Sequence, residues 1–255
     1  MIETNAVYVI VAREFKKFIR EKTRLVSTIA RPLVWLFLVG GGMSRLVPAA
    51  EGVTYMQFIF PGILGMTILF TSIFSSISII WDKEFGFMKE ILVAPISRFS
   101  IVVGKATSGM VLSTIQAMVI LSIFPLLGLH IGLLEVAGII LIAAVLSFAI
   151  SSLGILLASF YDSYESFSVI MNFIVMPMFF LSGAMYPVKM MPTVLQYLTR
   201  LNPLTYGIDA LKHLTLPQQS GAMGTDFPFV LDLAVIAASS IILVLLGGKA
   251  FERKG

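Results

Sequence analysis

Long apolar runs alternate with short polar segments along the whole chain. Six runs come close to the ~20 residues that a helix needs to cross a bilayer. They lie at about 25–45, 58–80, 102–127, 136–160, 167–185 and 229–247. None alternates at every second residue, as a membrane β-strand does. The pattern predicts an all-α integral membrane protein with six transmembrane helices in a single domain, 1–255.

Two segments outside these runs are amphipathic but too polar or too broken to span a membrane. Residues 3–22 repeat apolar positions every three or four residues and carry charges on the other face. This predicts a helix lying in the membrane interface. Residues 187–228 predict two short amphipathic helices, at 194–201 and 204–214, separated by an Asn-Pro pair.

The segment 81–95, between the second and third runs, is short, charged and amphipathic. It carries five charged residues, and its apolar positions Phe85, Met88, Ile91 and Leu92 follow a helical spacing. Such a helix is too short to cross the bilayer, so it lies in the interface or docks into a soluble partner. The pattern alone leaves both interpretations open: a docking element, or a surface connector with no partner.

Composition supports the membrane assignment and orients the chain. Hydrophobic residues make up 58% and charged residues 13%, whereas soluble domains carry roughly 25% charged residues. Cysteine is absent, which excludes disulfides, thiolate catalysis and cysteine-ligated metals. Of the 18 Lys and Arg residues, 13 fall on the side of the two termini and 4 on the other, with Arg31 inside a span. The positive-inside rule predicts that both termini and 81–95 are cytoplasmic and that 187–228 faces outward.

Catalytic and energy-coupling motifs are missing. The sequence around Gly104 and Lys105 lacks the upstream glycine and the adjacent hydroxyl of a phosphate-binding loop. The two histidines, His130 and His213, have no neighbouring metal ligand in sequence, so no metal site is expected. Carboxylates are nearly absent from the spans, although proton- or sodium-coupled carriers usually need them. We therefore expect no enzyme activity, no cofactor in this chain and no nucleic-acid partner, with any driving energy coming from another polypeptide.

Three ordered groups of residues resemble the type-2 ABC exporter family, the permeases of bacterial drug, lipid and polysaccharide export. The first is RPLVWL at 31–36, after the amphipathic N-terminal helix. The second runs from DKEFG at 82–86 through APISR to Gly104-Lys105. The third joins LSGA at 181–184 to LNPLTY at 201–206 and Asp209. The resemblance covers the whole length of the chain.

The resemblance implies an assembly and a set of sites. Two permeases would pair as a homodimer in a bacterial or archaeal plasma membrane, among membrane lipids, above two ATPase subunits that bind ATP and Mg. Spans two and five would line the pathway, and re-entrant outer helices would cap it. The coupling helix in contact with the ATPase would contain Asp82, Glu84, Phe85, Gly86, Met88, Glu90 and Leu92. The outer gate would contain Pro187, Tyr197, Asn202, Pro203 and Tyr206.

Side chains in spans two and five are the candidates for the pathway wall. They are Phe70, Thr71, Phe74, Ser75, Ser78, Met171, Asn172, Met176 and Phe179. Aromatic and methionine side chains suit apolar, variable cargo, whereas the dense hydroxyls favour a helix interface or a wetted wall. The expected function is the membrane subunit of an ATP-driven exporter of a hydrophobic or amphipathic molecule, such as a drug or lipid. The alternatives are export of a lipid-linked saccharide, a stand-alone channel or secondary carrier, and a lipid-modifying enzyme.

Overall fold

The computed structural model describes residues 3–46, 49, 52–88, 93, 96–217 and 223–254, and no strand occurs among them. Its α-helices are α1 (Thr4–Arg20), α2 (Lys22–Trp35), α3 (Gly41–Met43), α4 (Tyr55–Glu84), α6 (Arg98–Leu121), α7 (Leu133–Phe160), α8 (Tyr164–Phe180), α9 (Thr193–Arg200), α10 (Pro203–Thr215) and α11 (Phe229–Lys254). A π-helical turn, η1 (Leu36–Gly40), joins α2 to α3, and η2 (Phe124–Leu127) and η3 (Val188–Met190) are 3-10 turns.

Among the described residues, five helical stretches are long and apolar enough to cross a membrane: Leu25–Met43, Tyr55–Glu84, Arg98–Leu121, Leu133–Phe160 and Phe229–Phe251. They correspond to five of the six predicted spans, but the third ends at Leu121 and not at 127, because the chain breaks into the 3-10 turn η2 around Pro125. The fifth predicted span corresponds to α8, a shorter apolar helix of 17 residues, about 25 Å long at the ~1.5 Å rise of an α-helix. Beyond it the chain turns at Gly183, whose φ of +72° is a left-handed conformation.

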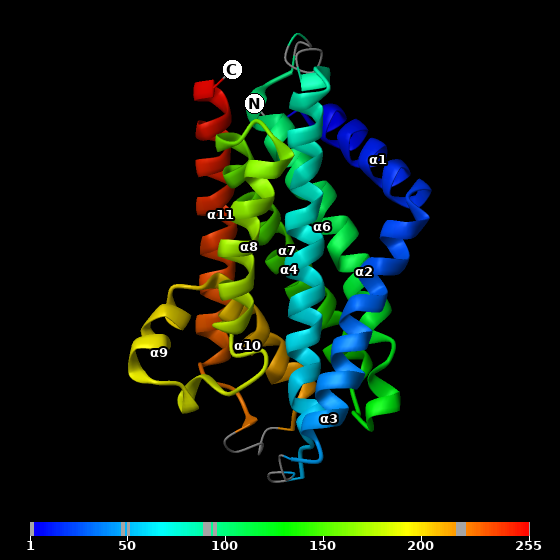
Figure 1. Cartoon of the computed structure of the whole chain (residues 1–255), viewed down its shortest axis with the longest axis vertical. Helices are drawn as coiled ribbons and strands as arrows, with labels where there is room; N and C mark the ends of the chain where they lie inside the picture. The colour runs from blue at the N-terminus through cyan, green and yellow to red at the C-terminus, as the bar shows by residue number, and fades with distance from the viewer. Residues whose placement is uncertain are drawn as a thin grey trace.

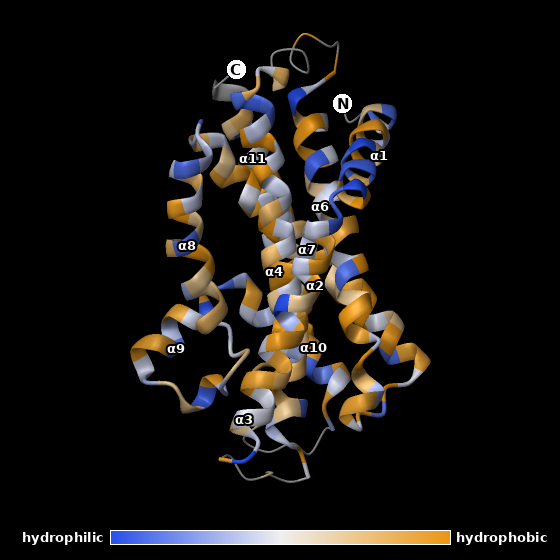
Figure 2. Ribbon diagram, turned by 45° about the vertical axis from the view of Figure 1, so that its right-hand side comes forward, coloured by the Kyte–Doolittle hydropathy of each residue, from blue (hydrophilic) through white to orange (hydrophobic). Residues whose placement is uncertain are grey.

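Helix α4 is the centre of the bundle. Of its apolar window, 83% is buried, against 17% for Leu25–Met43 and 22% for Phe229–Phe251. α6, α7, α8 and α10 pack around α4, and α11 packs on α7 (Figure 1). Both termini and α1 lie at one end of the bundle, and α9 and α10 lie towards the other (Figure 1). Hydrophilic positions gather along α1, whereas apolar positions predominate in the middle of the bundle (Figure 2).

Small side chains let α4, α6 and α7 approach closely. Ser72 and Ser113 share a hydrogen bond of 2.8 Å between α4 and α6. A Cβ added at Gly154 on α7 would collide with Ser76 on α4. Close contact through glycine and serine is how membrane helices pack without a hydrophobic drive between them. The hydroxyl-rich sequence left two roles open, a helix interface or a wetted wall. Ser72 and Ser76 lie in a helix interface.

The two short outer helices predicted after span five are present as α9 and α10. Asn202 begins α10: its side chain accepts a hydrogen bond from the Leu204 N–H and donates one to the Met178 carbonyl on α8. Pro203 follows as the first helical residue, where its missing N–H costs nothing. α10 packs against α4, α7 and α11. The Asn-Pro pair therefore places α10 against the bundle.

Candidate functional site

The end of α4 presents the first part of the predicted coupling segment. The helix stops at Glu84, and Gly86 turns the chain with φ +81° while its N–H donates to the Lys83 carbonyl. Glu84 and Phe85 are exposed, Phe85 to 71%, whereas Met88 is buried. Of the other predicted coupling residues, Asp82 is buried, and Glu90 and Leu92 lie outside the described residues.

Four charged side chains meet just inside this end of the bundle, and we call them the ion cluster: Arg13, Glu14, Asp82 and Lys105. The Lys105 ammonium, with 4% of the residue exposed, lies 2.7 Å from Glu14 Oε1 and 2.6 Å from Asp82 Oδ2. It also donates to Ser78 Oγ at 3.0 Å. One guanidinium nitrogen of Arg13 lies 2.9 and 3.0 Å from the two Asp82 oxygens.

The ion cluster balances its own charge. Two cations face two carboxylates, and Glu14, Asp82 and Lys105 are all buried. Buried charges persist when they are paired and hydrogen-bonded, and removal of one partner strands the other. The residues come from α1, from the last turn of α4 and from the second turn of α6. The cluster therefore fixes α1 to both helices that flank the predicted coupling segment.

Further contacts hold the same end together. The N-terminal end of α1 contacts the start of α6, because the N–H of its cap residue Glu3 donates to Ser100 Oγ at 2.9 Å. Lys17 on α1 places its ammonium over the Trp81 ring on α4, 4.6 Å from the centroid. Lys83 turns the other way and donates to the carbonyls of Ala158, Ser159 and Tyr161 at 3.0–3.3 Å. A cation at the last carbonyls of α7 complements the negative end of that helix.

A pocket of about 180 Å³ lies between α4 and α8. Five predicted pathway residues line it: Phe70, Phe74, Met171, Asn172 and Met176. The lining is apolar and aromatic apart from a few polar groups. The Asn172 amide donates to the Ser168 carbonyl of its own helix.

The remaining predicted pathway residues lie elsewhere. Thr71, Ser75 and Ser78 are on the α4 face that meets α6: Thr71 bonds Gln116, Ser75 lies against Gly109, and Ser78 joins the ion cluster. Phe179 is buried, with its ring 5.5 Å from that of Phe180. The two faces of α4 thus separate the aromatic candidates from the hydroxyl candidates.

The predicted gate residues lie in and next to the short helices α9 and α10. Tyr206 donates its hydroxyl to the Arg200 carbonyl at 2.9 Å, and Pro187 precedes η3. Tyr197 is exposed, with the Arg200 guanidinium 5.7 Å from its ring centroid. Asn202 and Pro203 begin α10, as described above.

A second buried polar group lies beside α10. The Asp209 carboxylate accepts hydrogen bonds from the backbone N–H groups of Asp226 and Phe227 at 2.8–3.0 Å. Burial raises the pKa of Asp209, and the Lys212 ammonium and these two N–H donors oppose that shift. The sequence patterns predict neither this group nor the partners of Asp82. The spacing of Asp209 and His213, one helical turn apart, was the available signal.

This geometry defines a class before any comparison: a multi-pass helical membrane protein with a charged, cross-linked end and an apolar pocket between two helices. Residues 5–216 match the model of a family described as "ABC-2 type transporter". The chain is 35% identical over 213 residues to ycf38 of Cyanophora paradoxa, which is named as a transport permease, covering 81% of this chain and 73% of that one.

Two further relatives agree. Nodulation protein J of Rhizobium meliloti (strain 1021) is 27% identical, covering 75% of this chain and 74% of its own. The inner membrane transport permease YadH of Escherichia coli (strain K12) is 24% identical, covering 95% and 93%. The chain belongs to the ABC-2 type transporter family, a family of transport permeases, and such a membrane subunit implies a partner ABC ATPase.

Proposed function

We propose that this chain is the membrane-spanning permease of an ATP-driven exporter, with both termini and the α4–α6 connection in the cytoplasm. The excess of Lys and Arg on that side supports the orientation. The family relationship supports a plasma-membrane location, because its YadH relative is named as an inner membrane permease.

The observation that carries the proposal is the ion cluster. An ATPase that binds beneath the permease must move the spans through the short segment between α4 and α6. Asp82 lies four residues before Gly86, at the point where α4 turns into that segment, and Lys105 lies on α6 beyond it. Because Lys105 bonds both Asp82 of α4 and Glu14 of α1, displacement of the segment moves three helices as a unit.

The exposed end of α4 supplies a docking surface. Phe85 and Phe87 are exposed to 71% and 53% beside the acidic Glu84. Exposed aromatic side chains are typical anchors of protein interfaces. We infer that they insert into the ATPase and that Glu84 and Glu90 pair with basic residues there.

The pocket between α4 and α8 supports hydrophobic or amphipathic cargo. Its aromatic and methionine walls adapt to varied apolar shapes. At about 180 Å³ it is smaller than the ~300 Å³ of a drug-sized site, so we infer that a second permease copy completes it. The apolar side chains that α8 exposes, Val169 and Phe173 among them, are available for that contact or for lipid.

Two alternatives lead to different observations. A lipid-linked saccharide would need polar groups along its route, and in the described pocket polar side chains are the minority. A channel or secondary carrier would act without an ATPase. The family match disfavours this second alternative because ABC-2 membrane subunits imply an ATPase partner.

The test is co-purification from native membranes in mild detergent, with mass spectrometry of the proteins recovered. The wild-type chain is expected to bring down an ATP-binding subunit. Phe85→Ser should lose that subunit, while Leu126→Ser, an equally exposed apolar position (80%) at the other end of the bundle, should keep it. Recovery of the chain alone, still active in liposomes without ATP, would refute the exporter assignment.

A further inference from the structure

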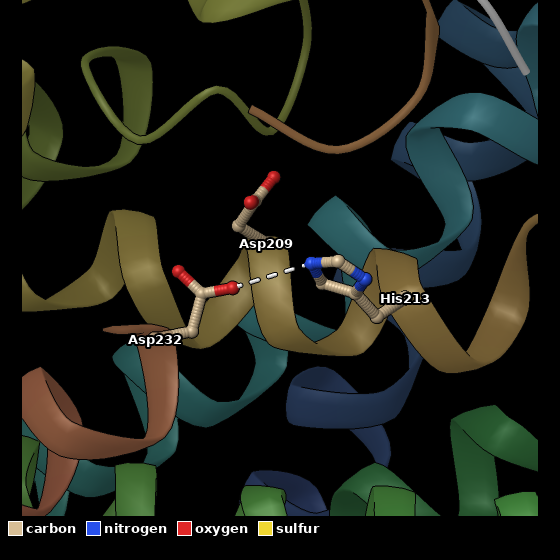
Figure 3. Close-up of side chains that lie close together, drawn as sticks. All are labelled: Asp209, His213 and Asp232. Atoms are coloured by element: carbon tan, nitrogen blue, oxygen red, sulfur yellow. Dashed lines mark ion pairs between the residues drawn. The ribbon is translucent and has the colours of Figure 1, made fainter. Parts of the chain in front are cut away.

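Three potential metal ligands converge on the side of the bundle away from the ion cluster. Asp209 and His213 lie one turn apart on α10, and Asp232 faces them from the first turn of α11 (Figure 3). One donor atom from each of the three lies within 4.8 Å of the others. The sequence gives no sign that Asp232 belongs here, because it comes from a different helix.

Asp232 is the unusual member. It is 0% exposed, and neither carboxylate oxygen accepts a hydrogen bond from an N–H or hydroxyl group of the described residues; the Asp209 carboxyl is its near side-chain neighbour. The imidazole Nε2 of His213 is 3.6 Å from Asp232 Oδ2, too far for a hydrogen bond (Figure 3). A buried carboxylate without donors is strongly disfavoured unless a cation or a proton accompanies it.

The surrounding charges do not compensate for it. Asp209, Asp226 and Asp232 are buried carboxylates, whereas Lys212 is the buried cation beside them, 3.4 Å from Asp226 and 3.9 Å from Asp209. With a neutral His213 these four side chains carry two excess negative charges. Even a protonated imidazole leaves one. A divalent cation is the single addition that brings the group to neutrality.

We propose that Asp209, His213 and Asp232 form a binding site for a first-row divalent cation of the Zn²⁺ type. Imidazole together with carboxylate oxygens is a donor set that suits zinc, and three protein ligands leave a fourth position open. In the structure His213 Nε2 donates a hydrogen bond to the Phe227 carbonyl oxygen at 3.0 Å. Zinc binding would release that proton and leave the carbonyl as a further oxygen donor. With metal–ligand bonds of about 2.0–2.2 Å the donors must approach to about 3.4 Å, so both carboxylates would turn toward the imidazole.

The site has an entrance and a mechanical consequence. A pocket of about 210 Å³, lined by His213, Lys212, Gly224 and Thr225, lies beside the imidazole and gives a cation a route in. The three ligands belong to α10 and α11, so a bound cation would lock the outer helix onto the last span. The inference is independent of cargo and of the ATPase, because it concerns this chain alone.

The experiment uses the purified full chain in detergent, stripped with a chelator and titrated with Zn²⁺. Bound zinc is measured by competition with a fluorescent indicator, and stability by the apparent unfolding temperature. We expect one zinc per chain and a rise of about 5–11 °C at a hundredfold excess over Kd. Asp232→Asn and His213→Gln should each weaken binding by about tenfold or more, and the exposed His130→Gln should leave it unchanged.

Two results would overturn the site. Zinc binding by Asp232→Asn and His213→Gln that equals that of wild type would place the metal elsewhere. A wild-type chain that binds no zinc, together with a metal-free Asp232→Asn of higher unfolding temperature, would show that a proton neutralises the buried carboxyl. Because His213 is 26% exposed, its variant is expected to fold even where Asp232→Asn does not.

Discussion

Replacement of Lys105 by methionine tests the ion cluster most sharply. Methionine keeps the length of the buried lysine stem but lacks the ammonium that bonds Glu14, Asp82 and Ser78. Glu14 then keeps the Arg13 guanidinium at 3.5 Å as its cationic neighbour, while Asp82 keeps its two contacts with Arg13. The variant therefore strands one buried carboxylate.

The expected loss follows from that count. Breaking a buried ion pair costs about 3–5 kcal/mol. The half-exposed Arg13 offsets part of it, so we expect about 3 kcal/mol less unfolding free energy. At about 2–4 °C per kcal/mol for a chain of this size, the apparent unfolding temperature should fall by about 6–12 °C. The double variant Lys105→Met with Glu14→Gln removes one charge of each sign and should recover at least about 1 kcal/mol.

The assay is thermal unfolding in detergent, followed by intrinsic fluorescence, on the wild type, the two single variants and the double variant. Lys105→Arg is the matched control for charge without identical geometry. A second measurement, stimulation of the co-purified ATPase, reports coupling. Single variants that unfold within about 1 °C of wild type, or losses that simply add in the double variant, would refute the cluster as a coupled unit.

Three other substitutions probe the connections around it. Gly86→Ala should cost about 1 kcal/mol of unfolding free energy, because φ is +81°. No neighbour obstructs the added Cβ, so the cost is that of the backbone conformation alone. ATP-driven transport should fall while membrane insertion stays normal, and unchanged transport counts against the role of the turn. Lys83→Met should loosen the end of α7, seen as faster hydrogen exchange at 156–160; protection equal to wild type contradicts the cap. Asn202→Ala should cost about 1–2 kcal/mol through the lost N-cap and the lost bond to Met178. Asn202→Ser, which keeps a capping oxygen and adds no charge to this buried position, should recover about half in the same unfolding assay.

Local patterns predicted the helices because hydrophobic period and caps are properties of neighbouring residues. The amphipathic 3–22 became α1, and the Asn-Pro pair correctly separated α9 from α10. Hydropathy places the end of the fifth span at 185, whereas α8 ends at Phe180. Apolar residues continue past Phe180, and it is the left-handed Gly183, not hydropathy, that accompanies the end of the helix.

The ion cluster was beyond sequence reasoning because its members are far apart in the chain. Lys105 is 91 positions from Glu14 and 23 from Asp82. On α1, Glu14 reads as one charge among several on the solvated face of an amphipathic helix. Its burial depends on where α1 packs. The two faces of α4 show the same limit. The helical spacing of residues shows which side chains share a face, but not which neighbouring helix that face contacts.

We expect an ATPase to engage the permease at the turn after α4. The most direct measurement places a photo-activatable amino acid at position 85 and, as control, at position 126, and illuminates native membranes. The expected result is a covalent adduct between position 85 and an ATP-binding subunit, with none from position 126. An ATP-binding subunit that co-purifies with the chain but is captured from position 126, and never from position 85, would contradict it.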